Sequence, residues 1–504
     1  MQKIVIAMPI KYNTASADYP KGLIGIIDIG SNSVRMVVYH ALKRVPLPLF
    51  NEKYMCGLGK GLARTGRLNP AGVKSARLTL ARFMLMAERL QLASLDILAT
   101  AAVRDAEDGQ KFVEELQREF GIRINVISGE REAELAAKGI IASVHDPLGI
   151  SADLGGGSME LASVERRSIG LTTTCSLGSL RILDASEGKT KAMQEIIKRE
   201  LKDIPWLKNA HPHCLYAIGG GFRTLAKLHM RKTHYPLAIV HEYTMSRRTI
   251  AQLIDKLLAL SPAEIASLPG ISQKRAPTMI PTALVLQQLL EVTAAPEVMF
   301  SVSGIREGFF YDLLSPKLQQ EDALTASATD LAALIGRQGE YAEELFRWME
   351  PLFVNEPIGW RRLRFALCTL SELAWSIDPL FRAEWAYHRI IQSSLKGLDH
   401  KERIMLALAL YHRYQPKWKS ERAELKLLDE RERLWARCTG LAAGLAYQFS
   451  GGRAGNLYHA QIRLVNTQLT LALDADASPL RTEAVEKRLD GLGEAFKAFS
   501  NFVL

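Results

Sequence analysis

Two short loops rich in glycine and serine are the residues best suited to chemistry. They read Asp-Ile-Gly-Ser-Asn-Ser at 28–33 and Asp-Leu-Gly-Gly-Gly-Ser at 153–158. Glycine lets a backbone turn approach a ligand closely, and hydroxyl, amide and free N–H groups donate hydrogen bonds to an anion. The first loop alone is better explained as a simple hairpin turn. In the second, three consecutive glycines cost backbone entropy that a structural turn rarely needs. The predicted phosphate ligands are Gly30, Ser31, Asn32, Ser33, Gly155, Gly156, Gly157 and Ser158.

Three carboxylates beside these loops could hold a divalent cation. Asp28 and Asp153 end the apolar stretches that lead into the loops, and Glu160 lies on the predicted strand that leaves the second loop. Carboxylate oxygens are hard ligands of the kind that Mg²⁺ prefers. For Glu160, a solvent-facing strand carboxylate explains the sequence equally well. We predict these three acids as the metal ligands.

Glu132 is the candidate general base. It lies in a predicted helix, on the same face as Leu135, Ala136 and Gly139, which should pack inward. A carboxylate on an inward face requires a reason, and activating a water molecule in a cleft would be one. The alternative is a buried glutamate paired with a basic side chain.

Two further positions could contact phosphate. Arg104 follows a predicted strand, and a guanidinium can bind phosphate oxygens with two hydrogen bonds and stabilise developing charge. A lone arginine is more often part of a surface salt bridge. Gly220, in a run of three glycines, could admit a phosphate at the start of a helix. A tight strand-to-helix turn is an equally good explanation there.

The elements that must position these residues are repeated along the chain. Residues 25–39 and 149–164 share a strand, an Asp-x-Gly turn, a small polar loop and a second strand, at one offset of 125 residues. A duplication of domain length is evidence about the fold. Mixed strands and helices of moderate length favour α/β layers, so we expect two similar lobes facing each other across a cleft.

The rest of the chain favours a helical C-terminal region. Beyond Ser315-Pro316 the leucine, alanine, glutamate and arginine residues recur at helical spacing. The predicted domains are lobe I at 1–144, lobe II at 145–316 and a helical domain at 317–504.

No apolar run has the length of a membrane span, and the start of the chain lacks a convincing signal peptide, so a cytoplasmic protein without membrane contact is expected. Five scattered cysteines without a CxxC pair suggest neither a disulfide framework nor a zinc site.

Positive charge is concentrated in one part of the chain. The net charge is +10, and residues 161–235 hold 13 basic and 6 acidic residues. A local basic excess attracts polyanions, although a solvated helix surface is the plainer explanation. No zinc finger, RNA-binding motif or helix-turn-helix pattern occurs, so nucleic acid is not expected as a partner. The residues predicted to guide a polyanion are Lys189, Lys191, Lys198, Arg199 and Lys202.

Seven motifs taken together resemble one family. DIGSNS, TAAVRDA, ISGEREAELAAKGI, DLGGGSMEL, SLGSLRI, IGGGFRTL and SVSGIREGFFYDLL occur in the order found in the exopolyphosphatase/guanosine-pentaphosphatase (Ppx/GppA) family. The resemblance implies two actin-like lobes of the ribonuclease H-like (ASKHA) superfamily, followed by an all-α HD-like domain. It also implies Mg²⁺-dependent hydrolysis of a terminal phosphoanhydride and a homodimer.

By motif position, the resemblance implies roles for the candidate residues. Glu132 resembles the family's catalytic base, Asp153 and Glu160 its metal-binding acids, and Arg104 with both loops its phosphate-binding group. Residues 272–281 lack the aspartate that the family often carries there. Where a His-Asp metal pair would occur in an HD-like domain, this chain has Ser371-Glu372, so a second metal-dependent site is not expected.

The resulting hypothesis is an exopolyphosphatase that releases orthophosphate from inorganic polyphosphate. The closest alternative is the same chemistry on guanosine pentaphosphate. Two further alternatives are an ATP-dependent sugar kinase of the same superfold and a catalytically idle regulator that binds polyphosphate or a nucleotide.

Overall fold

The computed structural model describes residues 21–334, 340–418 and 422–503. The chain divides into two compact units, Met1–Gln320 and Glu321–Leu504. No helix within the described residues is long and apolar enough to span a membrane. The predicted boundary between lobes I and II, at 144, falls at the end of α5 (Gly129–Ser143) and stays a prediction.

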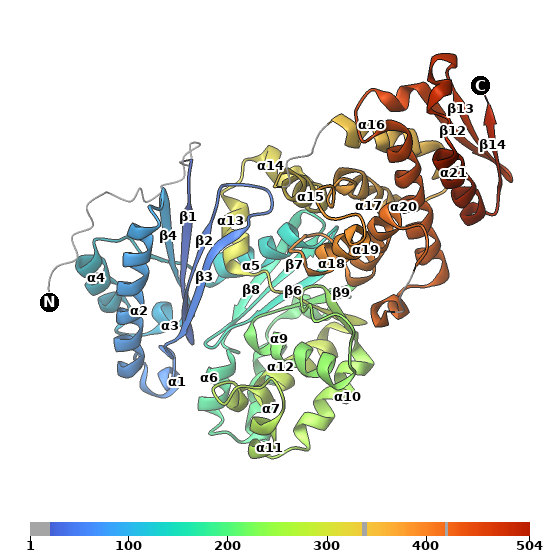
Figure 1. Ribbon diagram of the computed structural model, residues 1–504. Coiled ribbons are helices and arrows are strands. Elements are labelled where there is room, and N and C mark those ends of the chain that lie inside the picture. Colours follow the sequence, from blue (N-terminus) through green and yellow to red (C-terminus); the bar gives the residue numbers. More distant parts are fainter. Residues whose placement is uncertain (1–20, 335–339, 419–421, 504) are drawn as a thin grey trace. The chain divides into compact units, whose positions relative to one another are not determined.

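Lobe I is built on a five-stranded sheet in the order β3-β2-β1-β4-β5. Its strands are β1 (Ile24–Ile29), β2 (Ser33–Tyr39), β3 (Pro48–Met55), β4 (Ser94–Ala99) and β5 (Asn125–Val126). The first three strands are antiparallel, whereas β4 and β5 run parallel to β1. The connecting helices are α1 (Leu62–Thr65), α2 (Pro70–Arg89), α3 (Ala101–Asp105) and α4 (Gly109–Phe120). Helices α2 and α4 lie on the outer face of this sheet (Figure 1), and their buried apolar side chains form one core with it.

Lobe II repeats this arrangement. Its strands are β6 (Leu148–Leu154), β7 (Met159–Glu165), β8 (Ser168–Cys175), β9 (Cys214–Ile218), β10 (Tyr243–Ser246) and β11 (Glu297–Phe300). The order β8-β7-β6-β9-β11 matches β3-β2-β1-β4-β5, and β10 is added as an antiparallel edge. Asp28 pairs with Arg35 across β1 and β2, and Asp153 pairs with Glu160 across β6 and β7. The repeated topology confirms the predicted fold of two similar actin-like α/β lobes.

Helices cover the outer face of the second sheet. They are α6 (Ser179–Ala185), α7 (Thr190–Lys202), α8 (Pro205–Lys208), α9 (Gly220–Lys232), α10 (Arg247–Leu258), α11 (Pro262–Ser267) and α12 (Met279–Thr293), with a 3₁₀ turn η1 at Ala276–Thr278. Their apolar faces share one large core with β6, β7, β9 and β11. The inner faces of both sheets pack instead on α5 and α13 (Ile305–Asp312), and α14 (Pro316–Gln320) follows (Figure 1).

Helices α5 and α13 cross with their backbones in contact. A Cβ atom at Gly308 would lie 1.7 Å from the carbonyl oxygen of Leu135, and a Cβ at Gly139 would lie 2.5 Å from the carbonyl oxygen of Gly304. Only glycine allows so close an approach. This crossing fixes the first turn of α5, which carries Glu132, relative to α13.

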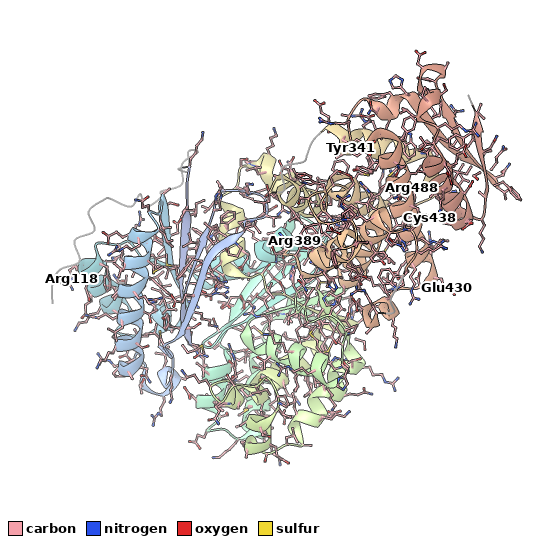
Figure 2. The ribbon with its side chains drawn as sticks, in the orientation of Figure 1. Arg118, Tyr341, Arg389, Glu430, Cys438 and Arg488 are labelled. Atoms are coloured by element: carbon pink, nitrogen blue, oxygen red, sulfur yellow. The ribbon has the colours of Figure 1, made fainter. Side chains whose placement is uncertain are left out.

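The C-terminal unit is mainly helical. Its helices are α15 (Ala323–Ala333), α16 (Glu340–Met349), α17 (Ile358–Leu370), α18 (Arg382–Gln392), α19 (His400–Tyr414), α20 (Glu430–Ser450) and α21 (Glu483–Phe496). Four 3₁₀ segments lie between them: η2 (Glu350–Leu352), η3 (Ala423–Leu427), η4 (Asn456–His459) and η5 (Ala475–Leu480). Figure 2 shows the side chains, with Tyr341 on α16, Cys438 on α20 and Arg488 on α21.

The helical prediction for this unit is confirmed, but "all-α" is wrong in one respect. Strands β12 (Ala460–Val465), β13 (Gln468–Leu473) and β14 (Phe499–Val503) form a three-stranded sheet. The turn between β12 and β13 places Asn466 at φ 54°, a conformation that asparagine tolerates better than most residues. Alternating buried and exposed positions along β12 and β13 match a sheet with one covered face.

Candidate active site

The two glycine- and serine-rich loops face each other across a cavity of about 140 Å³. Each loop is closed by the same hydrogen bond, from Gly30 N to Ser33 O and from Gly155 N to Ser158 O, both at 3.0 Å. A Cβ at Gly157 would lie 2.8 Å from the Oγ of Ser31, so the loops touch. All the predicted loop residues line this cavity: Gly30, Ser31, Asn32, Ser33, Gly155, Gly156, Gly157 and Ser158. Gly220 lines it as well.

Three of the predicted acids are buried at this cavity. Glu132 is 4 % exposed, Asp153 9 % and Glu160 1 %. Burial raises the pKa of Glu132 to about 7 against the lowering effect of Arg104, and it raises the pKa of Asp153 to about 6. The pKa of Glu160 is raised well above its usual range, first by burial and then by the charges of Glu132 and Asp153. Burial therefore disfavours the charged form of all three acids.

Glu132 is held in place from two sides. The Ser128 hydroxyl accepts from Arg131 N and caps α5, so Glu132 lies in the first turn, where the helix dipole favours a negative charge. Arg104 Nη1, on α3, donates to Glu132 Oε2 at 2.9 Å and to the carbonyl oxygen of Ile127 at 3.2 Å. Arg104 does not line the cavity itself. Its contacts make it a residue that positions Glu132.

Asp28 differs from the other two acids predicted to bind metal. Its Oδ2 accepts from Arg306 Nη1 on α13 at 2.8 Å. Within the described parts of the chain, no three His, Cys, Asp or Glu side chains are grouped so that they could hold a metal ion. The predicted set of three acidic ligands is therefore not a preformed site, because a guanidinium already balances Asp28. Asp153 and Glu160 are paired on neighbouring strands, and their shared buried charge fits a divalent cation.

Five basic side chains that were not predicted as site residues also line the cavity. They are Arg35 on β2, Lys53 on β3, Arg223 on α9, Arg275 before η1 and Arg306 on α13. Burial lowers the pKa of Arg223 to about 10, and Arg306 adds to the effect. Desolvation at the cleft, followed by the charges of Arg275 and Arg223, lowers the pKa of Lys53 to about 8.

One of these cations was detectable from the repeat. Arg35 stands 125 residues before Glu160, so the two occupy equivalent positions in the two copies. The cavity thus has a cation on one lobe where it has an anion on the other.

The five residues predicted to guide a polyanion lie elsewhere. Lys191, Lys198, Arg199 and Lys202 are exposed on α7, and Lys189 precedes this helix and pairs with Glu187 at 2.9 Å. None of the five lines the cavity between the loops. Residues 161–235 do carry an excess of basic residues. A count of charges along the sequence does not show which helix of the segment reaches the cleft.

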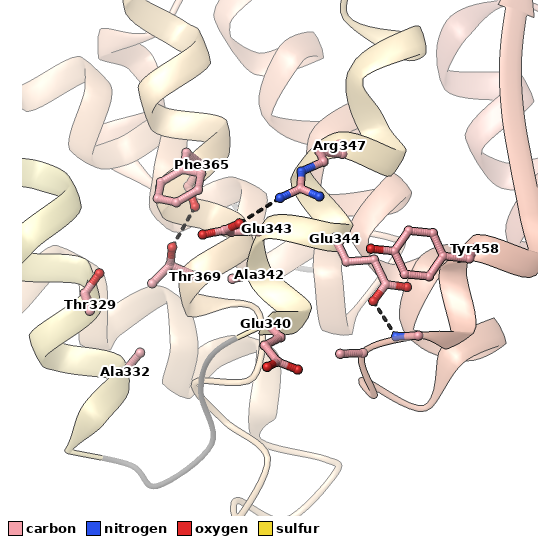
Figure 3. A pocket seen from close by; sticks show the side chains of 12 residues that line it. Thr329, Ala332, Glu340, Ala342, Glu343, Glu344, Arg347, Phe365, Thr369 and Tyr458 are labelled. Carbon is pink, nitrogen blue, oxygen red and sulfur yellow. Dashed lines mark hydrogen bonds and ion pairs between the residues drawn. The ribbon is translucent and has the colours of Figure 1, made fainter.

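A larger cavity, of about 730 Å³, lies in the C-terminal unit and offers less chemistry (Figure 3). Two of its carboxylates are engaged: Glu343 pairs with Arg347 at 2.8 Å, and Glu344 accepts from Gly455 N and Leu457 N. At the position where a His-Asp pair would occur in an HD-like domain, Glu372 accepts from Arg413 Nη2 at 2.5 Å. A guanidinium therefore stands beside that carboxylate.

The family model for the Ppx/GppA phosphatase family matches residues 37–317, and a model for the exopolyphosphatase C-terminal region matches residues 324–503. Retrograde regulation protein 2 of Saccharomyces cerevisiae is 24% identical over 449 residues, covering 78% of this chain and 73% of the relative. Exopolyphosphatase 1 of Mycobacterium tuberculosis is 26% identical over 315 residues, covering 60% of this chain and 90% of the relative.

Solved structures support the fold. An exopolyphosphatase from Cytophaga hutchinsonii superposes with a TM-score of 0.54 at 24% identity, covering 58% of this chain and 97% of that one. The Aquifex aeolicus member of the Ppx/GppA family gives 0.50 at 22% identity, covering 57% and 96%. With its family match over more than half its length, this chain belongs to the Ppx/GppA phosphatase family.

Proposed function

We propose that this protein is an exopolyphosphatase, which hydrolyses the terminal phosphoanhydride of inorganic polyphosphate and releases orthophosphate. One observation carries the proposal. A single cavity combines two anion-binding loops, a buried carboxylate with a pKa of about 7, and five basic side chains. Anion-binding loops suit the terminal phosphoryl group, and several cations suit the charged phosphates behind it.

The loops would bind the phosphoryl group that is transferred to water. The two loops line the cavity from two lobes, and Ser31, Ser33 and Ser158 are among the lining residues. Donors fixed before the reaction stabilise the charge that develops on phosphoryl oxygens without reorganising. Positioning and charge stabilisation supply most of the catalysis in phosphoryl transfer.

Glu132 would activate the attacking water. A base with a pKa near the working pH combines a deprotonated form with a useful driving force for proton transfer. The water oxygen attacks the terminal phosphorus while Glu132 takes its proton, and the bond from that phosphorus to the bridging oxygen breaks. The shortened chain leaves with its negative charge, close to the cations of the cleft. Arg104 keeps the Glu132 carboxylate oriented through the 2.9 Å hydrogen bond.

The buried acids fit a requirement for Mg²⁺. Two carboxylates, Asp153 and Glu160, are almost fully buried, and no guanidinium among the described residues is hydrogen-bonded to either. A bound cation would offset their mutual repulsion. Mg²⁺ is commonly held by one or two carboxylates together with substrate phosphates. When bound, it would neutralise charge on the phosphate oxygens.

The cavity lining supports polyphosphate over guanosine pentaphosphate. None of the described residues that line the cavity is aromatic, whereas basic side chains are abundant there. A guanine base would gain most from stacking on an aromatic face, and a polyphosphate chain needs only cations and hydrogen-bond donors. The homodimer and the cytoplasmic location expected from the sequence stay predictions, which light scattering and cell fractionation can check.

The test is phosphate release by the purified protein. Long-chain polyphosphate, guanosine pentaphosphate, and ATP with a sugar are compared at equal substrate concentration, with Mg²⁺ and with a chelator. We expect the fastest release from polyphosphate and a loss of activity in chelator. Faster release from the pentaphosphate would assign the alternative substrate, phosphate transfer to the sugar would assign a kinase, and no release at all would leave a binding protein.

A further inference from the structure

One face of α9 carries basic residues at every fourth position. Arg223, Lys227 and Arg231 follow the spacing i, i+4 and i+8, which places them along one side of the helix. Arg223 lines the active-site cavity, while Lys227 and Arg231 are exposed. At 1.5 Å per residue, the helix carries this row about 12 Å away from the cavity. The opposite face of α9 is buried through residues such as Phe222 and Leu225.

A second basic segment runs beside this row in the opposite direction. A Cβ at Gly270 would lie 2.4 Å from Nη1 of Arg231, near the end of α9. A Cβ at Gly220, the first residue of α9, would lie 2.2 Å from Nη2 of Arg275. Residues 270–275 therefore run from the end of α9 toward its start, where the guanidinium of Arg275 lies.

Neither of these two segments carries an acidic residue. Residues 219–241 and 268–278 contain no aspartate or glutamate. We define the α9 track as the four basic residues Arg223, Lys227, Arg231 and Arg275. Of the basic residues that the sequence shows in 161–235, one group lies on α7 and another on α9, and of these two helices only α9 reaches the cavity.

We propose that the α9 track binds the subterminal phosphates of a long polyphosphate chain as it leaves the active-site cavity. The inference rests on the proposed function, since it concerns the rest of the same substrate. A chain whose terminal phosphoryl lies in the loops would pass Arg223 and Arg275 first and then Lys227 and Arg231. A row of cations matched to a linear polyanion releases counterions on binding, which makes the affinity fall as salt rises.

The track gives the protein a preference for long chains. Only a chain that reaches beyond the cavity can contact Lys227 and Arg231, so tripolyphosphate should not gain from them. The extra contacts hold the substrate and not the reacting bond, so they lower KM and leave kcat unchanged.

The test compares three double variants of the full chain. Lys227→Ala with Arg231→Ala removes two charges from the track. Lys227→Arg with Arg231→Lys retains both charges and changes the side-chain shapes. Lys198→Ala with Lys202→Ala removes two charges from α7, the helix that the sequence alone favoured. For each variant, kcat and KM are measured with long polyphosphate and with tripolyphosphate at several salt concentrations, and the unfolding temperature is recorded.

The first variant should raise KM for long polyphosphate about tenfold. The slope of log affinity against log salt concentration should fall by the equivalent of about two phosphate contacts. Its kcat, and its KM for tripolyphosphate, should change less than about twofold. The charge-retaining and α7 variants should behave like the unmodified protein. Equal losses on both substrates, a loss in the charge-retaining variant, or a loss confined to the α7 variant would each overturn the proposal.

Two further measurements distinguish a failure of the α9 track from a failure of the proposed function. Binding of long polyphosphate is measured in a Glu132→Gln background, where turnover does not interfere, with single-stranded DNA at equal phosphate concentration as competitor. Displacement by DNA as effective as by polyphosphate would assign the surface to nucleic acid instead. If the unmodified protein releases no phosphate from any chain, the proposed function fails. If it is active but the α9 variant keeps its long-chain affinity, only the track fails.

Discussion

Replacing Glu132 by glutamine tests the centre of the mechanism. The side chain is 4 % exposed, and its Oε2 accepts from Arg104. Glutamine keeps the size of the side chain and one acceptor oxygen, so the packing of α5 should survive. It cannot accept a proton from water. General-base catalysis contributes about 10²- to 10⁴-fold, so kcat should fall by that factor, equivalent to about 2.7–5.5 kcal/mol in the barrier.

The assay is phosphate release at saturating polyphosphate and Mg²⁺, at pH 8. With a Glu132 pKa of about 7, about nine tenths of this carboxyl group is deprotonated there, so the unmodified protein works near its maximum. The matched control is Glu134→Gln on the same helix. Glu134 pairs with Lys138 at 2.7 Å and with Arg131 at 2.6 Å on the outer side of α5, and its loss should change kcat less than about twofold.

Substrate binding separates loss of chemistry from loss of structure. The Glu132→Gln variant should bind polyphosphate as tightly as the unmodified protein, or more tightly, because a negative charge near the phosphates is gone. A variant that keeps more than about a tenth of the normal kcat would refute the general-base assignment. A variant that loses binding and activity together would show that Glu132 is required for the structure of the cleft.

Three further outcomes follow from the geometry. Asp153→Asn should raise the Mg²⁺ concentration for half-maximal activity about tenfold or more, and an unchanged titration would place the ion elsewhere. Arg104→Met removes the cation that lowers the pKa of Glu132, so this pKa should rise. The acid limb of the profile of kcat/KM against pH should then move to higher pH. An unmoved limb would contradict the pairing of Arg104 with Glu132. Gly308→Ala places a methyl group against a backbone carbonyl and should lower the free energy of unfolding by about 1–3 kcal/mol. The control Gly491→Ala, in open space on α21, should raise it by about 0.5–1 kcal/mol. Equal effects of the two substitutions would refute the close crossing of α5 and α13.

The loops and the duplicated lobes could be predicted because their evidence is local. Each Asp-x-Gly loop lies within a few residues of its own strands, and the fixed offset between Asp28 and Asp153 made the repeat visible. Glu132 was found for a similar reason, because helical spacing alone placed it on an inward face. In each case a short stretch of sequence was sufficient.

The basic side of the cleft could not be found in this way. Arg35, Lys53, Arg223, Arg275 and Arg306 come from five separate elements, and only the packing of the two lobes brings them to one cavity. A local count of charges pointed to α7 because it gives no information on which helix faces the cleft. The three-stranded C-terminal sheet was missed for another reason: its strands have only five or six residues, interrupting a long run of helical periodicity.

The opposite charges of Arg35 and Glu160 show what is gained when two copies of a fold are joined in one polypeptide. Two identical chains related by a twofold axis would have to carry the same residue at both positions, and the cleft between them would receive either two cations or two anions. Once the copies are fused, each can change alone. At this pair of positions, lobe I supplies a cation to the cleft and lobe II supplies an acid. The different charges at these two equivalent positions therefore depend on broken symmetry, which a covalent duplication makes available.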